Sequence, residues 1–305
     1  MSVKNPLLEY SNRSYGMDHD RYPWSMLKDR RKVEWPNGKK IALWVNVSLQ
    51  YFPVAQTDKT FPVPGGMRMP YPDLRHFSLR DYGNRVGIYR ILKILDENNV
   101  RPTIAMNASI AENYPSLTRR IVERDYEIIA HGIDMDTLHH SEIELEVETE
   151  RVKKAVTTLR SLTGQPIKGW LSPGKSQSFN TPELLVDNEI EYMCDWVNDE
   201  LPYVFHTSTS SLINLPLNTE LEDSFILLNN LHSIESYVDQ VKDAMAFLRK
   251  EANEKGGRML ALSIHPWLMG QPHRIKHFKG LIETLVGYDD VWAASGSEII
   301  AAASL

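Results

Sequence analysis

Short apolar runs alternate along the chain with longer segments whose apolar residues recur at helical spacing. Eight runs are predicted to be strands: residues 41–47, 102–106, 126–130, 167–171, 191–193, 212–215, 259–264 and 291–293. Amphipathic patterns predict helices at 84–98, 109–124 and 141–162, with further helices beginning near Thr181, Ser233, Arg274 and Ser297. Repeated strand-then-helix units are typical of a parallel α/β barrel, or failing that of an open doubly wound sheet.

Two segments do not follow this pattern. Residues 1–40 are polar and irregular with scattered aromatic residues, which suggests an arm on the surface of the body or of a neighbouring subunit. Residues 41–305 are expected to form one barrel domain. Within it, residues 51–80 are rich in Pro and Gly and are predicted to be a long loop that acts as a lid or wall of a substrate site.

Charge and composition narrow the function. The 305 residues include 34 Lys and Arg against 40 Asp and Glu, a net charge of −6, without a run of like charges. Because nucleic acids and anionic membranes require a concentrated basic face, we expect neither as a partner. No apolar stretch is long enough to span a membrane and no secretory segment opens the chain, so we expect a cytoplasmic protein that acts on a small molecule.

Candidate chemistry gathers where the predicted strands end. In parallel α/β proteins the reactive groups lie at the carboxyl edge of the sheet. The candidates that follow four of the strands are Asn46, Ser48, Gln50, His131, Gly174, Lys175, Gln177 and His265. Asp195 is a fifth candidate, after the short run 191–193. Several such residues that converge on one face are stronger evidence than any one of them alone.

Seven segments, in order, carry a family resemblance: 41–45 (IALWV), 80–87 (RDYGNRVG), 130–133 (AHGI), 169–174 (GWLSPG) with 179–181 (FNT), 195–199 (DWVND), 265–270 (HPWLMG) and 295–299 (SGSEI). The chain resembles the polysaccharide deacetylases of the NodB-homology type, and more closely their cytoplasmic branch of cyclic imide hydrolases and metal-independent allantoinases. The resemblance covers roughly residues 30–300. It implies a distorted (β/α) barrel of about seven parallel strands and an enzyme that opens ring amides.

The resemblance also implies which positions would hold a metal. Deacetylases carry an Asp pair on the first strand and a His-x-x-x-His pair, whereas here Ser48 and Gln50 (or Asn46) and then His131 and Met135 stand at these positions. The imide and allantoin hydrolases carry Glu where Gln50 stands, so the general base is also missing from its family position. One imidazole with a hydroxyl, an amide and a thioether does not supply three zinc ligands, so we expect no metal.

We therefore expect a hydrolase of a C–N bond in a small cyclic amide, imide or ureide. His265 is the expected acid or base because imidazole titrates near neutrality. The backbone N–H groups of Gly174 and Lys175 are expected to form an oxyanion hole, as the resembling loop does, and His131 or Asp195 to hold or relay a proton. The expected substrate contacts are Asn46, Ser48, Gln50, Arg85, Lys175, Gln177, Asn198 and Trp267.

Two alternatives stay open. Residues 131–140 hold three His and two Asp, so a metal-dependent deacetylase-like hydrolase with zinc or another divalent ion at His131 and rewired ligands is one of them. The other is a catalytically inactive barrel that binds a ligand or partner, because the family carboxylates are absent. In all three cases the aromatic residues of the N-terminal arm suggest a homo-oligomer, either a dimer or a tetramer.

Overall fold

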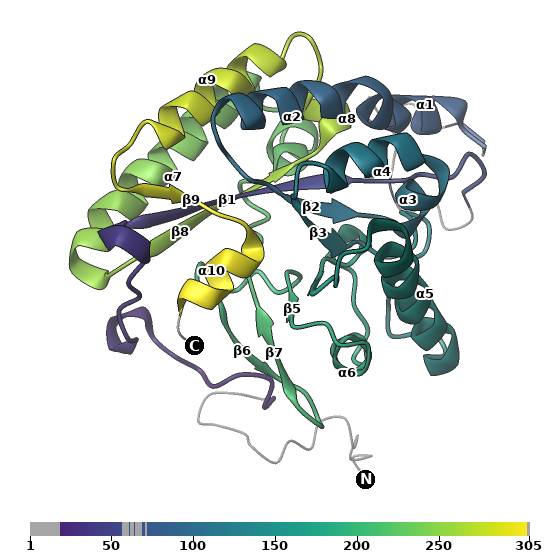
Figure 1. Cartoon of the computed structure of the whole chain (residues 1–305), viewed down its shortest axis with the longest axis horizontal. Coiled ribbons are helices and arrows are strands. Elements are labelled where there is room, and N and C mark those ends of the chain that lie inside the picture. Colours follow the sequence, from purple (N-terminus) through teal and green to yellow (C-terminus); the bar gives the residue numbers. More distant parts are fainter. Residues whose placement is uncertain (1–18, 57–60, 62–63, 65–68, 71, 304–305) are drawn as a thin grey trace.

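A curled, mostly parallel β-sheet forms the centre of the molecule (Figure 1). The computed structural model describes residues 19–56, 61, 64, 69–70 and 72–303. Within them the strands are β1 Ile41–Leu49, β2 Thr103–Met106, β3 Glu127–Ala130, β4 Gly169–Trp170, β5 Tyr192–Met193, β6 Tyr203–His206, β7 Ser211–Asn214, β8 Arg258–Ile264 and β9 Val291–Ala293. Their order is β6-β7-β5-β4-β3-β2-β1-β8, with β9 beside the start of β1. The sheet is thus a half-barrel, and the expected α/β class is confirmed.

Helices cover the outer face of this sheet. The α-helices are α1 Leu74–Tyr82, α2 Ile88–Glu97, α3 Ala108–Asn113, α4 Pro115–Val122, α5 Leu145–Thr163, α6 Thr181–Asp187, α7 Ile234–Lys255, α8 Pro266–Met269, α9 Ile275–Val286 and α10 Gly296–Ala303. Helix α10 lies on the opposite, inner side of the sheet, apart from the others (Figure 1). The outer helices bury one apolar cluster against one face of the sheet. Helix α10 helps to bury a second apolar cluster against the other face.

Strand β1 shows how these two clusters position the site. Its nine residues are all buried, as the continuous apolar run predicted. Leu43 and Val45 belong to the outer cluster, whereas Ala42 and Trp44 belong to the inner one. Because successive side chains of a strand point to opposite faces, the polar series that continues from Trp44, beginning with Asn46, lies on the inner face.

Three local predictions need correction. The segment predicted as a loop at 51–80 ends earlier, because α1 begins at Leu74 and continues through the π-helix η4 (Gly83–Gly87) into α2. The predicted helix 109–124 is two helices, since Pro115 starts α4 after a non-helical Tyr114. Strand β6 was not predicted, and its pairing with β7 is antiparallel. Residues 57–60, 62–63, 65–68 and 71 of the predicted lid lie outside the described residues.

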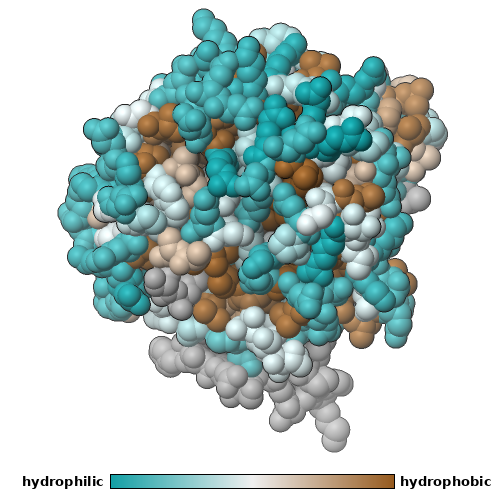
Figure 2. Space-filling model, in the orientation of Figure 1, coloured by the Kyte–Doolittle hydropathy of each residue, from teal (hydrophilic) through white to brown (hydrophobic). Residues whose placement is uncertain are grey.

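The described part of the N-terminal arm lies on the barrel. Trp35 is buried and its indole N–H donates to the carbonyl of Arg258 at 2.8 Å. Arg21 forms an ion pair with Glu183 of α6 at 2.6 Å. Polar residues cover most of the face in Figure 2, with smaller apolar areas between them. None of the helices among the described residues is long and apolar enough to cross a membrane.

Candidate active site

A buried His–Asp pair lies at the carboxyl end of β8. His265 follows the strand directly and precedes α8. Its Nδ1 lies 2.6 Å from Oδ1 of Asp223, and its backbone N–H donates to Oδ2 of the same carboxylate at 2.8 Å. Burial alone would lower the pKa of His265, but the charge and hydrogen bond of Asp223 outweigh it and raise that pKa. Asp223 therefore favours the protonated imidazole, and the Nε2 of this ring is not bound by that carboxylate.

A second ion pair faces this imidazole. Glu222 Oε2 lies 2.8 Å from Nζ of Lys175, and Oε1 lies 4.0 Å from Nε2 of His265. Burial would raise the pKa of Glu222, but the charges of Lys175 and His265 together with hydrogen bonds lower it to about 2. Glu222 is therefore ionised at neutral pH, and the site contains two carboxylates.

Neither of these carboxylates was among the residues selected from the sequence. Asp223 lies 42 residues before His265 in the chain, at the entry to the π-helix η6 (Phe225–Asn229). Such π-helical turns often occur at functional sites. The only local signal is an acidic pair, 222–223, between apolar residues such as Leu217 and Ile226 that are themselves buried. Apolar residues on both sides of the acidic pair are a signal that the sequence offers, because such residues are usually buried and would bring the carboxylates toward the interior.

His131, at the end of β3, has the opposite environment. Its Nδ1 lies 2.7 Å from the carbonyl oxygen of Leu171, which assigns the proton to Nδ1 and leaves Nε2 as an acceptor. Burial, together with the charges of His265 and Lys175, lowers the pKa of His131 to about 4. The imidazole is therefore neutral at pH 7. Its Nε2 faces the amide nitrogen of Gln50 at 3.4 Å.

The end of β1 supplies amides and a hydroxyl to the same region. Asn46 donates from Nδ2 to Oγ of Ser48 at 3.1 Å, and both side chains are buried. The backbone carbonyl of Gln50 accepts from Nδ2 of Asn84, which lies in η4, at 3.0 Å. These contacts connect the first strand to the π-helical turn and place Gln50 beside His131.

The loop after β4 is a tight turn in contact with its neighbours. Gly174 has φ +64°, and a Cβ there would lie 2.9 Å from the ring of Phe61. The backbone N–H of Lys175 donates to the carbonyl of Ser172 at 2.9 Å. The expectation that this N–H forms part of an oxyanion hole is therefore wrong, since the turn already uses it. The N–H of Gly174 is the one that stays a candidate.

Asp195 and Gln177 belong to a separate polar network. Asp195 accepts from the backbone N–H and the hydroxyl of Ser172, both at 2.8 Å, and from Gln177 Nε2 at 2.7 Å. Gln177 Oε1 in turn accepts from the indole of Trp196 at 2.8 Å. Burial raises the pKa of Asp195 to about 6. These contacts connect the ends of β4 and β5, and none of them involves His131 or His265.

The remaining predicted contacts divide between the site and the surface. Trp267 is buried, and the guanidinium carbon of Arg80 lies 4.1 Å from its ring centroid. The charge of Arg80 also acts on His265, so this cation borders the site although the sequence did not single it out. Arg85 and Asn198 are both exposed, and Asn198 accepts from the hydroxyl of Tyr203.

The positions that hold a metal in the resembling deacetylases do not fit one in this chain. Ser48, Gln50 and His131 offer one imidazole beside a hydroxyl and an amide. Of the alternative ligands, His139 instead contacts Glu148 at 3.1 Å, and Asp134 accepts from the N–H of Asp136 in a turn. In the part of the chain that the structure describes, no three His, Cys, Asp or Glu side chains gather in a way that could hold a metal ion.

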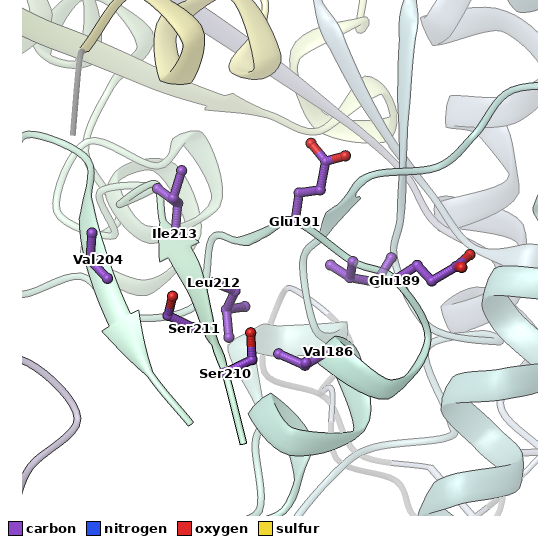
Figure 3. Close-up of a pocket in the computed structure, with 9 residues that line it drawn as sticks. Val186, Glu189, Glu191, Val204, Ser210, Ser211, Leu212 and Ile213 are labelled. Carbon is purple, nitrogen blue, oxygen red and sulfur yellow. The ribbon is translucent and has the colours of Figure 1, made fainter. Parts of the chain in front are cut away.

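A shallow open hollow lies elsewhere, between α6, β5 and the β6–β7 hairpin (Figure 3). It encloses about 500 Å³ and is lined by Val186, Glu189, Ile190, Glu191, Val204, Ser210, Ser211, Leu212 and Ile213. Its two carboxylates are already paired, Glu189 with Arg160 and Glu191 with Lys168. Without a histidine or an unpaired charge in its lining, this hollow is a weaker candidate than the cluster around His265.

Comparisons with known proteins give a family match and a similar fold. Residues 80–193 match the family model for polysaccharide deacetylases. The fold is similar to that of a PuuE allantoinase and of a probable polysaccharide deacetylase from Pseudomonas aeruginosa PAO1, each with a TM-score of 0.79, 24% identity and coverage of 92% of this chain and 97% of the other. A Schizosaccharomyces pombe protein whose name places it among the polysaccharide deacetylases is 24% identical over 296 residues, 87% of this chain and 90% of that protein.

Proposed function

We propose that this chain, whose residues 80–193 match the family model for polysaccharide deacetylases, hydrolyses a C–N bond in a small cyclic amide, imide or ureide. The family is hydrolytic and acts on C–N bonds. One observation carries the proposal: two buried imidazoles, His131 and His265, have pKa values displaced in opposite directions. Titratable groups whose surroundings separate their pKa values in this way are suited to opposite roles in proton transfer.

His265 is the proposed general acid. The Asp223 carboxylate lies 2.6 Å from its Nδ1, raises the pKa of the ring and leaves Nε2 for the substrate. Amide cleavage requires a proton on the leaving group, because an amide anion is too basic to depart unassisted. A protonated histidine can supply this proton from Nε2.

His131 is the proposed partner of the attacking water. Its Nε2 lone pair is an acceptor at neutral pH, and the amide of Gln50 lies beside it. A water beside these groups that donates to Nε2 of His131 would be oriented by this acceptor as it attacks the carbonyl carbon. The N–H of Gly174 is the proposed donor to the oxyanion that forms. These residues supply an acid, an acceptor for water and an oxyanion contact.

The surroundings favour a small ring over a glycan. The ring of Phe61 lies against Gly174, and the buried rings of Phe52 and Trp267 both contact the Arg80 guanidinium. Apolar walls with a few convergent polar groups are typical of pockets that enclose a small ligand. The fold similarity to a protein named as an allantoinase supports a ring substrate too.

A substrate panel tests this proposal. We would assay succinimide, maleimide, hydantoin, dihydrouracil and allantoin beside acetylated chitooligosaccharides under one protocol, by ring opening and by acetate release. We expect turnover of at least one ring and none of the glycan. Acetate release with no ring opened would contradict the proposal and favour a metal-dependent deacetylase, whereas no activity on any of them would favour an inactive barrel.

A further inference from the structure

His265 and Glu222 approach each other at the candidate site without a direct hydrogen bond. His265 Nε2 and Glu222 Oε1 are 4.0 Å apart, which is too long for a direct hydrogen bond. The other atoms of both groups are occupied, Nδ1 by Asp223 and Oε2 by Lys175. Oε1 accepts from the hydroxyl of Ser224, but a carboxylate oxygen can accept a second hydrogen bond. A donor on protonated His265 and an acceptor on Glu222 therefore lie side by side, 4.0 Å apart.

This pair is complementary to one edge of a ring amide. A protonated imidazole offers N–H, and an ionised carboxylate offers an oxygen acceptor beside it. A small ring forces the amide into the cis form, so that its C=O and N–H point to the same side, with O and N about 2.2 Å apart from the bond lengths. In an open-chain trans amide, such as an acetamido group, the two point to opposite sides.

We infer that Glu222 determines specificity by accepting a hydrogen bond from the ring N–H while His265 donates to the adjacent carbonyl oxygen. Two slightly divergent hydrogen bonds of ordinary length connect the amide edge to the 4.0 Å protein pair. The inference rests on the proposed function. It agrees with His265 as the acid, because the leaving nitrogen of an imide or ureide is conjugated with a second carbonyl, whose oxygen can take the proton as the C–N bond breaks.

Lys175 has a supporting part in this arrangement. Its Nζ binds Oε2 of Glu222 at 2.8 Å and the hydroxyl of Thr219 at 3.0 Å. The ion pair between Lys175 and Glu222 keeps Glu222 ionised and leaves its Oε1 near His265. Ser48, on the first strand, and Gln50, directly after it, are neutral. The two carboxylates next to His265, Glu222 and Asp223, come instead from the segment before η6.

An N-methyl comparison tests the inference. Succinimide and N-methylsuccinimide differ in the donor that Glu222 would bind, and the methyl group also brings carbon against the carboxylate. Wild type is expected to prefer succinimide by about 10- to 100-fold in affinity and in kcat/KM, since sites that hydrogen-bond a substrate N–H reject analogues without it. In Glu222→Gln, Lys175 would hold the amide oxygen and NH₂ would face the ring, so the preference should fall toward one.

Glu183→Gln is the matched control. Glu183 forms an ion pair of similar exposure with Arg21, at 2.6 Å, outside the site. This variant should keep the wild-type preference. Affinities would be measured by ligand-observed NMR and calorimetry, and turnover by ring opening, so that recognition and catalysis are recorded separately.

The possible outcomes distinguish the role of Glu222 from the proposed hydrolysis. A preference that Glu222→Gln removes and Glu183→Gln keeps supports the inference. Equal loss of rate on both rings in Glu222→Gln would make Glu222 a general base or a structural group and overturn it. If Glu222→Gln fails to fold, the wild-type comparison decides, because equal affinity for both rings overturns the inference while leaving hydrolysis intact. Selective binding without turnover contradicts the proposed function alone, and no binding of either ring overturns both.

Discussion

At the scale of single residues, the partner of a buried imidazole decides its charge. His131 and His265 are both almost fully buried. His131 bonds a backbone carbonyl, whose dipole only partly replaces the water that a charged ring would lose. His265 bonds the carboxylate of Asp223, a full opposite charge. Burial therefore lowers the pKa of His131, whereas the carboxylate raises the pKa of His265 despite the same burial.

Asp223→Asn should lower the pKa of His265 and favour its neutral form near pH 7. The loss of the carboxylate removes the main group that holds the pKa of His265 up against burial. We expect an NMR titration to show a lower pKa for this imidazole. The alkaline limb of kcat/KM should move to lower pH, with a rate loss of about 10²- to 10⁴-fold at pH 8 for an active ring substrate.

The control for this change is Asp290→Asn. Asp290 also pairs with a cation, Arg249, at 2.9 Å, but it lies away from the site. This variant should leave both the His265 titration and the pH profile unchanged. An Asp223→Asn protein with an unaltered profile would return Asp223 to a structural role.

At the scale of elements, close packing of the helix formed by α1, η4 and α2 against α8 positions His265. A Cβ at Gly83 would lie 2.6 Å from the backbone nitrogen of Trp267, and one at Gly87 only 2.1 Å from the carbonyl oxygen of Pro266. A side chain at either position would therefore collide with the backbone of α8, which explains why both residues are glycines. The same π-helical turn carries Asn84, which bonds the backbone of Gln50, so the two sides of the site are held by one element.

Gly87→Ala should weaken both stability and activity. The added carbon meets backbone atoms that cannot move independently, so we expect the free energy of unfolding to fall by about 1–3 kcal/mol in urea titration. Displacement of α8 would also misplace His265 and reduce kcat on an active ring substrate. Gly280→Ala is the control, because a Cβ there meets nothing within 4 Å in helix α9. That variant should be neutral or more stable by about 0.5–1 kcal/mol.

At the scale of the whole molecule, buried histidines make the fold sensitive to acid. His131 and His76 have pKa values of about 4 because burial disfavours their charged forms. An unfolded chain takes up protons on these rings near pH 6.5, while the folded chain does not until about pH 4. Stability is therefore lost as pH falls through this window. The raised pKa of Asp195, about 6, acts in the opposite direction and offsets part of the loss.

Urea titrations at pH 7.5 and pH 5 should record this loss. Each of the two imidazoles should lower the free energy of unfolding by about 2 kcal/mol at pH 5, and Asp195 should return about 1 kcal/mol. His131→Gln should remove about 2 kcal/mol of the pH dependence. A His131→Gln protein with the wild-type pH dependence would contradict the neutral, buried state of His131.

Local pattern alone was enough for most of the architecture. The buried run of β1, the order of strands and helices and the positions of His131 and His265 after strands all depend on residues a few positions apart, where side-chain periodicity acts directly. Even at this level, the π-helical continuation through Gly83–Gly87 and the hairpin strand β6 were missed. Their conformations depend on packing against α8 and on pairing with β7, respectively.

Only the tertiary structure decided the chemistry of the candidate site. Asp223 reaches His265 across 42 residues, and no spacing rule connects an acidic pair before η6 with a strand end so far away. The hydrogen bonds of Asp195 and of the Lys175 N–H likewise depend on how neighbouring loops pack. Sequence periodicity determines which face a side chain takes, because it acts through the backbone nearby. Charge states and donor–acceptor pairs depend on which groups meet in space, and folding alone brings those groups together.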